Sequence, residues 1–465
     1  MTTASVNPSR RSYAPLAREN RQKVLKHLEQ AGITSGVLYL TGMKTEERKW
    51  TDCEVPFRQE SNFFYLTGVT EPDCHLVIDV ASQDAHVFIP KFSEDHALWM
   101  GPPPTETFIK ERYGVQHCDV VDNIVKTLES LKASKVHILE QEKDLAAIGA
   151  FKDKIDSSAL STAVTEARMI KSKGEIELMR RAAKISGDAH IALMKAAKPG
   201  KDTERQLQAL FEYECFRNDG RYQAYTPIVA SGRNGSVLHY IDNTDPIAQD
   251  KRDLLLVDAG CEYECYAADI TRTFPIGGKF EGDWKTTYEI VLSMQNAVLA
   301  AIKPGVEWED MHKLANRVAA EGLLKAGLIK GDLDTLIANH IPALFFPHGL
   351  GHSIGLDVHD VGGYPKGVPR LTDPGLKYLR MRRTLKPGMA VTVEPGIYFV
   401  DAILDKALAD SNVTQYLDVE VVKRFRKTVG GVRIEDDVVV TETGVDNLTG
   451  WVPKEVADIE KVMSA

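Results

Sequence analysis

Residues 254–275 have the sequence LLLVDAGCEYECYAADITRTFP, and this stretch decides the fold of the chain around it. The apolar run at its start ends in Asp258, and a second β-rich run follows Asp269. Short apolar runs bounded by turn residues are typical of buried strands. We therefore predict a hairpin whose turn region lies at residues 261–265 and which sets the carboxylates of Asp258 and Asp269 side by side.

Two stretches with the same layout lie before and after this hairpin. They are LMKAAKPGKDTERQLQALFE at 193–212 and AVLAAIKPGVEWEDMHKLANR at 297–317. Each contains the end of a helix, the stop signal Lys-Pro-Gly and a second helix with an acidic start, and Thr203 with Gln206 fits a capping box. Such an internal repeat predicts a pseudo-two-fold domain with two similar halves facing each other across a cleft.

The chain of 465 residues is too long for one ordinary hydrophobic core, which stops growing at roughly 250 to 300 residues. We predict a disordered tail at 1–13, a mixed α/β domain at 14–160, a linker at 161–172 and a second domain at 173–465. Within the first domain we expect a helix ending near Gly32, a helix at 119–133 and a strand at 135–140. Further strands are predicted at GVLYLTG (36–42), NFFYLTG (62–68), CHLVIDV (74–80) and HVFIP (86–90).

Bulk composition excludes several classes of partner. The net charge is -9 without a dense Lys/Arg block, which disfavours binding to nucleic acid. No stretch approaches the ~20 apolar residues of a membrane span. The six cysteines are scattered and form no C-x-x-C pair, as in proteins of reducing compartments. We therefore expect a cytoplasmic protein. The start of the chain carries Arg10, Arg11 and Arg18 and no acid before Glu19, as organelle signals do, but we interpret its first residues as a disordered tail.

Acidic and imidazole groups recur at the ends of β-rich stretches in the second domain. Besides Asp258 and Asp269, these are Glu394 in AVTVEPGIYF, Glu435 in GGVRIEDDVVVT, and His348, His352 and His359 in PHGLGHSIGLDVHD. Each alone is most simply a loop cap or a structural histidine. Four carboxylates in one site repel each other, however, and two divalent cations would neutralise them and lower the pKa of bound water. Oxygen-rich ligands with one imidazole favour Mn²⁺, and Co²⁺, Fe²⁺ or Zn²⁺ can substitute in vitro.

Five motifs, in order, resemble those of the creatinase and aminopeptidase P family of metallopeptidases. They are SGRNGSVLHY, DAGCEYECYAADITRTFP, FFPHGLGHSIGLDVHDVGGY, TVEPGIYF and GGVRIEDD. The resemblance covers nearly the whole chain. It implies an α/β (α+β) fold, with an N-terminal creatinase-like mixed α/β domain and a C-terminal pita-bread catalytic domain that has pseudo-two-fold halves.

The resemblance also implies a ligand set for two Mn²⁺ ions per subunit. Asp258 would bind one metal, His352 and Glu394 the other, and Asp269 and Glu435 would bridge the two. The second histidine of the family's His-Gly-x-x-His motif is the ligand, which selects His352 over His348.

Further site residues follow from the same resemblance. Glu394, His359 and His239 would be catalytic, with Glu394 moving a proton and the histidines contacting substrate. Arg433 would brace a bridging carboxylate, and Tyr225 and His348 would line the cleft, although Tyr225 also fits a core aromatic. Arg380, in the loop VGGYPKGVPRLTDPGLKYLRMRRTLKPG, would clamp a terminal carboxylate, whereas its alternative reading is a solvated charge in LRMRR.

The implied function is hydrolysis of the Xaa-Pro bond in dipeptides or short peptides, by a homodimer. Acting on longer peptides as an aminopeptidase is the alternative. A non-catalytic, peptide-binding member of the fold is a more remote one, because the complete ligand set argues against it. The expected partners are therefore short proline-containing peptides.

Overall fold

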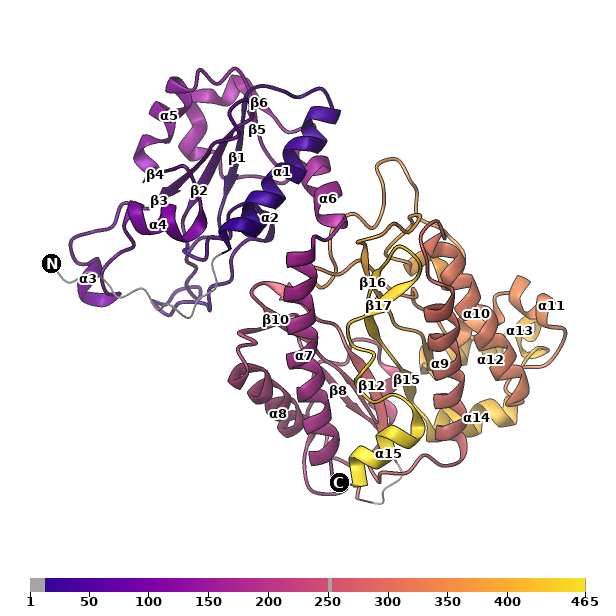
Figure 1. The fold of residues 1–465 in the computed structure, drawn as a ribbon. Helices are drawn as coiled ribbons and strands as arrows, with labels where there is room; N and C mark the ends of the chain where they lie inside the picture. Colours follow the sequence, from indigo (N-terminus) through magenta and orange to yellow (C-terminus); the bar gives the residue numbers. More distant parts are fainter. Residues whose placement is uncertain (1–12, 250–252, 465) are drawn as a thin grey trace. The chain divides into compact units, whose positions relative to one another are not determined.

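The structure is a computed structural model that describes residues 13–249 and 253–464 (Figure 1). The chain forms two compact units divided between Arg168 and Met169. The tail predicted for 1–13 lies outside the described residues except for Tyr13, whose side chain is buried.

The N-terminal unit contains a six-stranded mixed sheet with the strand order β4-β3-β2-β1-β5-β6. Strands β1, β2 and β3 are antiparallel, whereas β4, β5 and β6 join by parallel pairing. The elements are α1 (Ala14–Gln30), β1 (Val37–Thr41), α2 (Ser61–Thr67), β2 (His75–Asp79), β3 (Ala85–Ile89), α3 (His96–Trp99), α4 (Glu106–Tyr113), β4 (His117–Val120), α5 (Ile124–Ser130), β5 (Val136–His137), β6 (Ile155–Asp156) and α6 (Leu160–Met169). Tyr39, Val77 and Phe88 join α5 in the core beside the sheet.

One predicted strand of this unit is wrong, because NFFYLTG forms helix α2. The carboxylate of Glu60 accepts the backbone N–H of Phe63 at 2.7 Å and caps the helix start. Gly68 ends the helix in the left-handed region, with a φ of 69°. Every residue of α2 is buried, so the continuous apolar run carried no periodicity that distinguishes helix from strand.

The segment 161–172, predicted as a linker, is mostly helix α6. Leu160, Ala163, Val164 and Ala167 are buried and recur at helical spacing, so a short apolar stripe holds this helix in place. Serine and threonine residues lie between these apolar positions, so their helical spacing was not recognised in the sequence.

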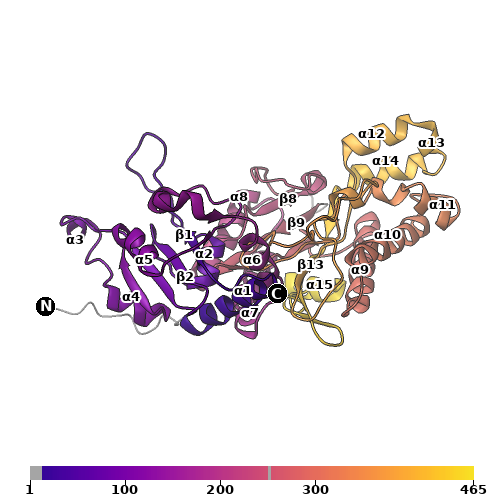
Figure 2. The same ribbon diagram turned by 90° about the horizontal axis from the view of Figure 1, so that it is seen from above.

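The C-terminal unit contains the two helix pairs predicted from the Lys-Pro-Gly repeat. The first is α7 (Lys173–Ala196) with α8 (Glu204–Arg217), and the second is α9 (Gly282–Ala301) with α10 (Trp308–Lys325). The capping box of Thr203 and Gln206 is present. Helices α9 and α10 run side by side in both ribbon views (Figures 1 and 2). Each pair precedes a three-stranded antiparallel sheet, β12-β9-β8 after the first and β13-β16-β17 after the second.

The remaining elements of this unit are strands and short helices around those sheets. They are β7 (Tyr222–Gln223), β8 (Ile228–Ser231), β9 (Leu254–Asp258), β10 (Cys261–Tyr263), β11 (Tyr266–Ala267), β12 (Thr271–Pro275), α11 (Leu333–Ala338), β13 (Ala390–Val393), β14 (Gly396–Tyr398), α12 (Asp401–Ala409), α13 (Ser411–Thr414), α14 (Val419–Thr428), β15 (Gly431–Arg433), β16 (Asp436–Val440), β17 (Val445–Asn447) and α15 (Val456–Ser464).

The predicted pairing around Asp258 and Asp269 is confirmed. Strands β9 and β12 are antiparallel, with Asp258 opposite Thr271. The chain between them turns through β10 and β11, and at Gly260 an added Cβ would lie 1.9 Å from the carbonyl oxygen of Ala268. Only glycine allows this approach, which brings Asp269 back beside Asp258.

The sheets β12-β9-β8 and β13-β16-β17 meet beside this pairing. The backbone N–H of Glu435 donates to the carbonyl oxygen of Thr271 at 3.0 Å. The next residue of each segment is fully buried, and these two residues, Arg272 and Asp436, form an ion pair at 2.7 Å. Asp436 also accepts hydrogen bonds from Asn447 at 3.0 Å and from Lys454 at 2.5 Å. The cations Arg272 and Lys454 lower the pKa of Asp436 against the effect of burial. Strands from the two repeats are thereby joined in register.

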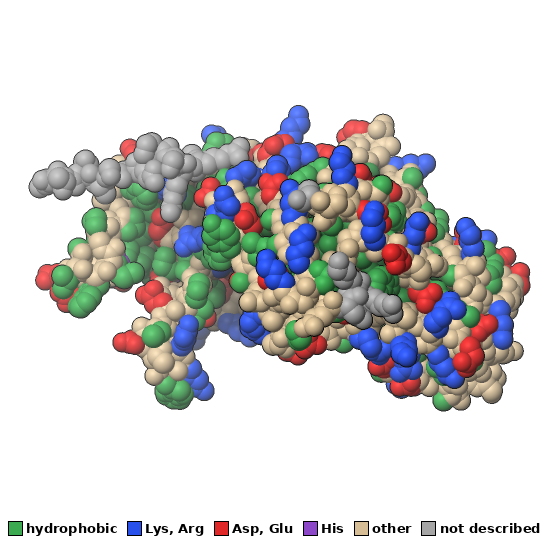
Figure 3. Space-filling model, turned by 90° about the horizontal axis from the view of Figure 1, so that it is seen from below, with side chains coloured by type: hydrophobic (Ala, Val, Ile, Leu, Met, Phe, Trp, Pro, Cys, Tyr) green, Lys and Arg blue, Asp and Glu red, His purple; other side chains and the backbone are tan. Residues whose placement is uncertain are grey.

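Basic and acidic side chains are interspersed on the face of the molecule drawn in Figure 3. Among the described helices, none is both long and apolar enough to cross a lipid bilayer.

We expect Asp436→Ala to destabilise the C-terminal unit by ~3–5 kcal/mol, because it leaves the Arg272 guanidinium buried without its counter-ion. Urea unfolding followed by circular dichroism measures the change. The matched control is Asp188→Ala, which breaks the exposed Lys184–Asp188 pair and should cost less than ~1 kcal/mol. Equal effects of the two substitutions would show that the buried pair does not hold the sheets together.

Candidate active site

The structure brings all of the residues predicted for the site to one cleft of about 860 Å³. The five predicted ligands come from five places along the unit. Asp258 ends β9, Asp269 precedes β12, Glu394 follows β13, Glu435 lies between β15 and β16, and His352 lies in the loop before β13. This loop is held against β13, because the backbone N–H of Thr392 donates to the His352 carbonyl at 2.9 Å. At Gly351 an added Cβ would lie 2.1 Å from the Thr392 carbonyl oxygen, so only glycine fits beside His352.

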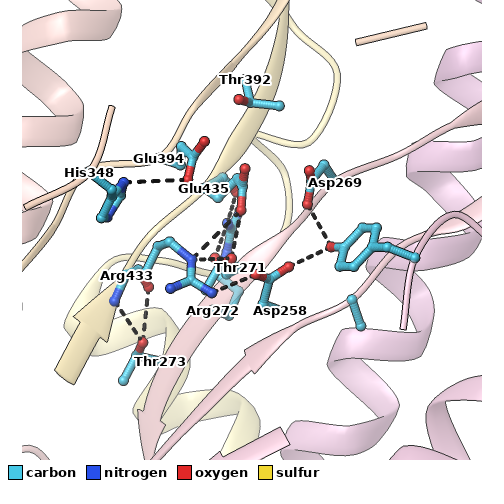
Figure 4. A network of polar contacts seen from close by, with 12 residues as sticks. Asp258, Asp269, Thr271, Arg272, Thr273, His348, Thr392, Glu394, Arg433 and Glu435 are labelled. Atoms are coloured by element: carbon cyan, nitrogen blue, oxygen red, sulfur yellow. Dashed lines mark hydrogen bonds and ion pairs between the residues drawn. The ribbon is translucent and has the colours of Figure 1, made fainter. Parts of the chain in front are cut away.

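Asp269, His352 and Glu435 lie within coordination range of a common ion, and Glu394 is next to His352. His352 Nε2 is 3.4 Å from Asp269 Oδ2 and 3.6 Å from Glu394 Oε1. Asp269, His352 and Glu435 each offer a ligand atom within 4.8 Å of the others. Thr271 Oγ1 donates to Glu435 Oε2 at 2.6 Å and so fixes the orientation of that carboxylate (Figure 4). Oxygen atoms with one imidazole nitrogen are a ligand set for a divalent ion.

The electrostatics of the cluster support a cation site. Burial raises the pKa of Glu394 to about 7, and burial together with Asp269 and Glu394 raises the pKa of Glu435 well above its ordinary value. Burial opposes a charge on His352, yet its contacts with Asp269 and Glu394 raise the pKa of the imidazole. Burial first, and then repulsion between the carboxylates, disfavours their charged forms. A divalent ion would supply the missing positive charge, so the residues fit a metal.

Arg433 is the buried cation within this cluster. Its Nη2 contacts Asp258 Oδ2 at 2.5 Å, and its Nε donates to Thr271 Oγ1 at 3.0 Å and lies 4.0 Å from Glu435 Oε2 (Figure 4). Its Nη1 donates to the hydroxyl of Tyr398 at 2.8 Å. Nearby negative charge raises the pKa of Arg433 against the effect of burial, so this side chain remains charged.

Tyr225 bridges the two aspartates of the β9/β12 pairing. Its hydroxyl oxygen lies 2.5 Å from Asp258 Oδ1 and 2.6 Å from Asp269 Oδ1. Burial and these carboxylates raise the pKa of the phenol well above its ordinary value, so Tyr225 keeps its proton. A hydroxyl with one proton donates to one carboxylate at a time, which leaves the pair short of donors.

Two of the cleft histidines, His348 and His359, are neutral groups beside this cluster. Burial and Arg433 lower the pKa of His348 to about 3, and burial with His352 and Arg380 lowers that of His359 to about 4. His348 Nδ1 lies 2.8 Å from the Gly349 carbonyl and therefore carries the proton, so Nε2 accepts from the Tyr398 hydroxyl at 3.0 Å. His359 packs edge-on against His352 with ring centroids 4.4 Å apart, and His239 lines the same cleft.

Sequence reasoning missed three residues that contact the cluster. Thr271 bonds Glu435, Tyr398 links Arg433 to His348, and Asp437 Oδ2 accepts the backbone N–H of Asp269 at 3.0 Å. Thr271 and Asp437 each lie two residues after a predicted ligand, on the same side of an extended chain. That spacing was the available signal, and Tyr398 offered none.

Comparisons with known proteins agree with this geometry. Residues 177–442 match the family described as metallopeptidase family M24, and residues 17–139 match the aminopeptidase P N-terminal domain. The Xaa-Pro dipeptidase of Homo sapiens is 43% identical over 458 residues, which cover 96% of this chain and 92% of the relative. A probable Xaa-Pro aminopeptidase of Pyrenophora tritici-repentis is 41% identical over 452 residues, or 96% of each chain.

Solved structures show the same fold. The aminopeptidase PepP of Pseudomonas aeruginosa superposes with a TM-score of 0.82 at 34% identity, covering 96% of this chain and 97% of its own. A zinc-substituted aminopeptidase P of E. coli in complex with product gives a TM-score of 0.81 at 32% identity, covering 97% and 98%. The chain therefore belongs to metallopeptidase family M24 and carries an N-terminal domain of the aminopeptidase P type.

Proposed function

We propose that this chain hydrolyses the peptide bond before proline in dipeptides and short peptides, in a reaction that depends on divalent metal ions. The observation that carries the proposal is that four carboxylates and His352 line one cleft, which Arg380 also lines. The similarity to Xaa-Pro dipeptidases and Xaa-Pro aminopeptidases supports the choice of substrate.

Two ions per subunit would be held as the family resemblance implies. Asp258 would bind one, His352 and Glu394 the other, and Asp269 and Glu435 both. The second of these sites draws on the contacts of His352 with Asp269 and Glu394. When bound, such ions activate water as a nucleophile at neutral pH and polarise the substrate carbonyl.

Residues of the chain would handle the proton and the developing charge. Glu394 lies in the same cleft as the proposed ions, and its carboxylate is placed to pass a proton from the attacking water to the leaving proline nitrogen. His359 is neutral, because its pKa is lowered to about 4, and so retains one N–H for the carbonyl oxygen of the substrate. We assign His239, on the same cleft, the matching role of holding the substrate.

Recognition would depend on the charged termini of the peptide substrate rather than on hydrogen bonds to its backbone. A proline peptide lacks the N–H that most peptidases use to hold an extended chain. Arg380 lines the cleft, and none of the ion pairs among residues 13–249 and 253–464 includes it. A free guanidinium in a small cleft is suited to the carboxylate of a terminal proline.

Finer parts of the proposal concern the metal, the assembly and the location. We propose Mn²⁺ as the physiological ion, because the ligands are mostly oxygen. A homodimer is proposed from the family resemblance. A cytoplasmic location is supported by the six cysteines, all of which are free thiols. We assign catalysis to a domain spanning 173–465.

Two other functions can be compared with the proposed hydrolysis of Xaa-Pro dipeptides. Activity on longer peptides, as an Xaa-Pro aminopeptidase, is favoured by the similarity to the aminopeptidase P structures. A non-catalytic binding role is disfavoured, because all five proposed ligands are present and lie together.

Hydrolysis of Gly-Pro and of Ala-Pro-Ala by the purified protein tests the proposal, with Mn²⁺ and after chelation. We expect Mn²⁺-dependent cleavage of Gly-Pro that chelation abolishes, because the carboxylates alone cannot activate water. Preference for Ala-Pro-Ala would establish the aminopeptidase instead. Cleavage of neither peptide would support the binding role.

Glu394→Gln should stabilise the metal-free protein increasingly as the pH rises. Burial raises the pKa of Glu394 from 4.5 to about 7, so the folded state binds this proton more tightly than the unfolded state. Folded protein with Glu394 therefore loses stability as the pH rises through this interval, whereas glutamine carries no charge. We expect the difference in unfolding free energy to reach on the order of 3 kcal/mol at pH 8.

Urea unfolding in the presence of a chelator, at several pH values from 4 to 8, measures this difference. The control is Glu442→Gln, the same chemical change at an exposed position outside the cleft. A difference for Glu394→Gln that does not change with pH would contradict a destabilising charge at this position.

A further inference from the structure

The loop 361–388 brings a second arginine to the cleft. Arg370 and Arg380 both line it, together with Tyr378. Arg370 Nη1 donates to the carbonyl oxygen of Leu379 at 3.1 Å, and its guanidinium lies 4.9 Å from the ring centroid of Tyr364. The hydroxyl of Tyr364 donates to the same carbonyl at 2.8 Å. Arg370 is therefore fixed beside the residue that precedes Arg380.

Arg370 and Arg380 differ from the neighbouring Arg382 in having no acidic partner among the residues that the structure describes. Arg382 pairs with Glu309 at 3.1 Å. Across the described part of the chain, no ion pair involves Arg370 or Arg380. The acidic residue Asp401, which also lines the cleft, is already held by Arg233 and Arg426 at 2.7 Å each. Two guanidinium groups in one cleft thus lack a counter-ion from the protein.

We propose that Arg370 is a specificity-determining residue, which binds the C-terminal carboxylate of the substrate together with Arg380. The inference rests on the proposed Xaa-Pro peptidase function and extends it from one arginine to two. A carboxylate has two oxygens that accept several hydrogen bonds, and a guanidinium has five N–H donors. Arg370 uses one nitrogen on Leu379 and keeps the others for the ligand. Stacking on Tyr364 restricts the side chain before the substrate arrives, which lowers the entropic cost of binding.

The bond from Arg370 to Leu379 also suggests a purely structural role, as a brace of the loop. Tyr364 makes an equivalent bond to the same carbonyl without carrying a charge. Tyr364→Phe therefore removes a brace and keeps the ring on which Arg370 stacks. Arg370→Gln removes the charge and keeps a side chain that can donate to Leu379. Comparing these two variants separates charge recognition from bracing.

The test measures KM and kcat for Gly-Pro and for Gly-prolinamide, whose terminal carboxylate is replaced by a neutral amide. We expect Arg370→Gln to raise the KM for Gly-Pro about five- to tenfold with little change in kcat, and to leave the KM for Gly-prolinamide unchanged. Arg380→Gln should change the two substrates in the same pattern. Arg370→Lys should recover part of the loss, and Tyr364→Phe should leave the ratio of the two KM values unchanged.

Three results would overturn the inference while leaving the peptidase function intact. They are an unchanged KM for Gly-Pro in Arg370→Gln, an equal rise for both substrates, and a Tyr364→Phe variant that reproduces the effect. Failure of the unmodified protein to cleave Gly-Pro would instead reject the function on which the inference rests.

Discussion

The mutual repulsion of four carboxylates in one cleft is the constraint on which the rest of the C-terminal unit depends. Asp258, Asp269, Glu394 and Glu435 line the same cavity, and Arg433 is the buried cation among them. Burial and the mutual repulsion of the carboxylates raise the pKa values of Glu394 and Glu435, and Arg433, which pairs with Asp258, does not offset this rise. A site that stores uncompensated negative charge costs stability without cations, and such a cost is characteristic of functional sites.

The duplicated architecture explains how acids from distant parts of the chain meet. One repeat supplies the β9/β12 pairing, and the other supplies the segment around β15 and β16. The two join where the Glu435 N–H donates to the Thr271 carbonyl. Directly beside this junction, the buried pair of Arg272 and Asp436 binds the two sheets. The structural ion pair thus lies next to the candidate metal site but is complete in itself, whereas the carboxylates of the site are not.

Secondary-structure elements that are set by nearby residues were predictable from the sequence, and features that depend on tertiary contacts were not. The β9/β12 pairing and the two helix pairs followed from apolar runs and capping residues, which act over a few residues. NFFYLTG was misassigned because a fully buried run has no periodicity, and only Glu60 and Gly68 define it as helix. The site residues were predicted from the resemblance to the family, and they share one cleft because the chain has the fold of that family. The placement of Arg370 on Leu379 depends on how one loop folds, and that of Tyr398 between Arg433 and His348 depends on the pairing of β14 with β15. No sequence spacing encodes either arrangement.

Metal content tests most directly whether the carboxylate cluster is a site for two divalent ions. The protein, stripped with chelator, re-equilibrated with Mn²⁺ and freed of excess, would be analysed for metal per chain. We predict two ions per chain in the unmodified protein and a loss of bound metal in Asp269→Ala, because Asp269 is proposed to contact both ions. A chain that retains no metal, or an Asp269→Ala variant that retains as much as the parent, would contradict the account.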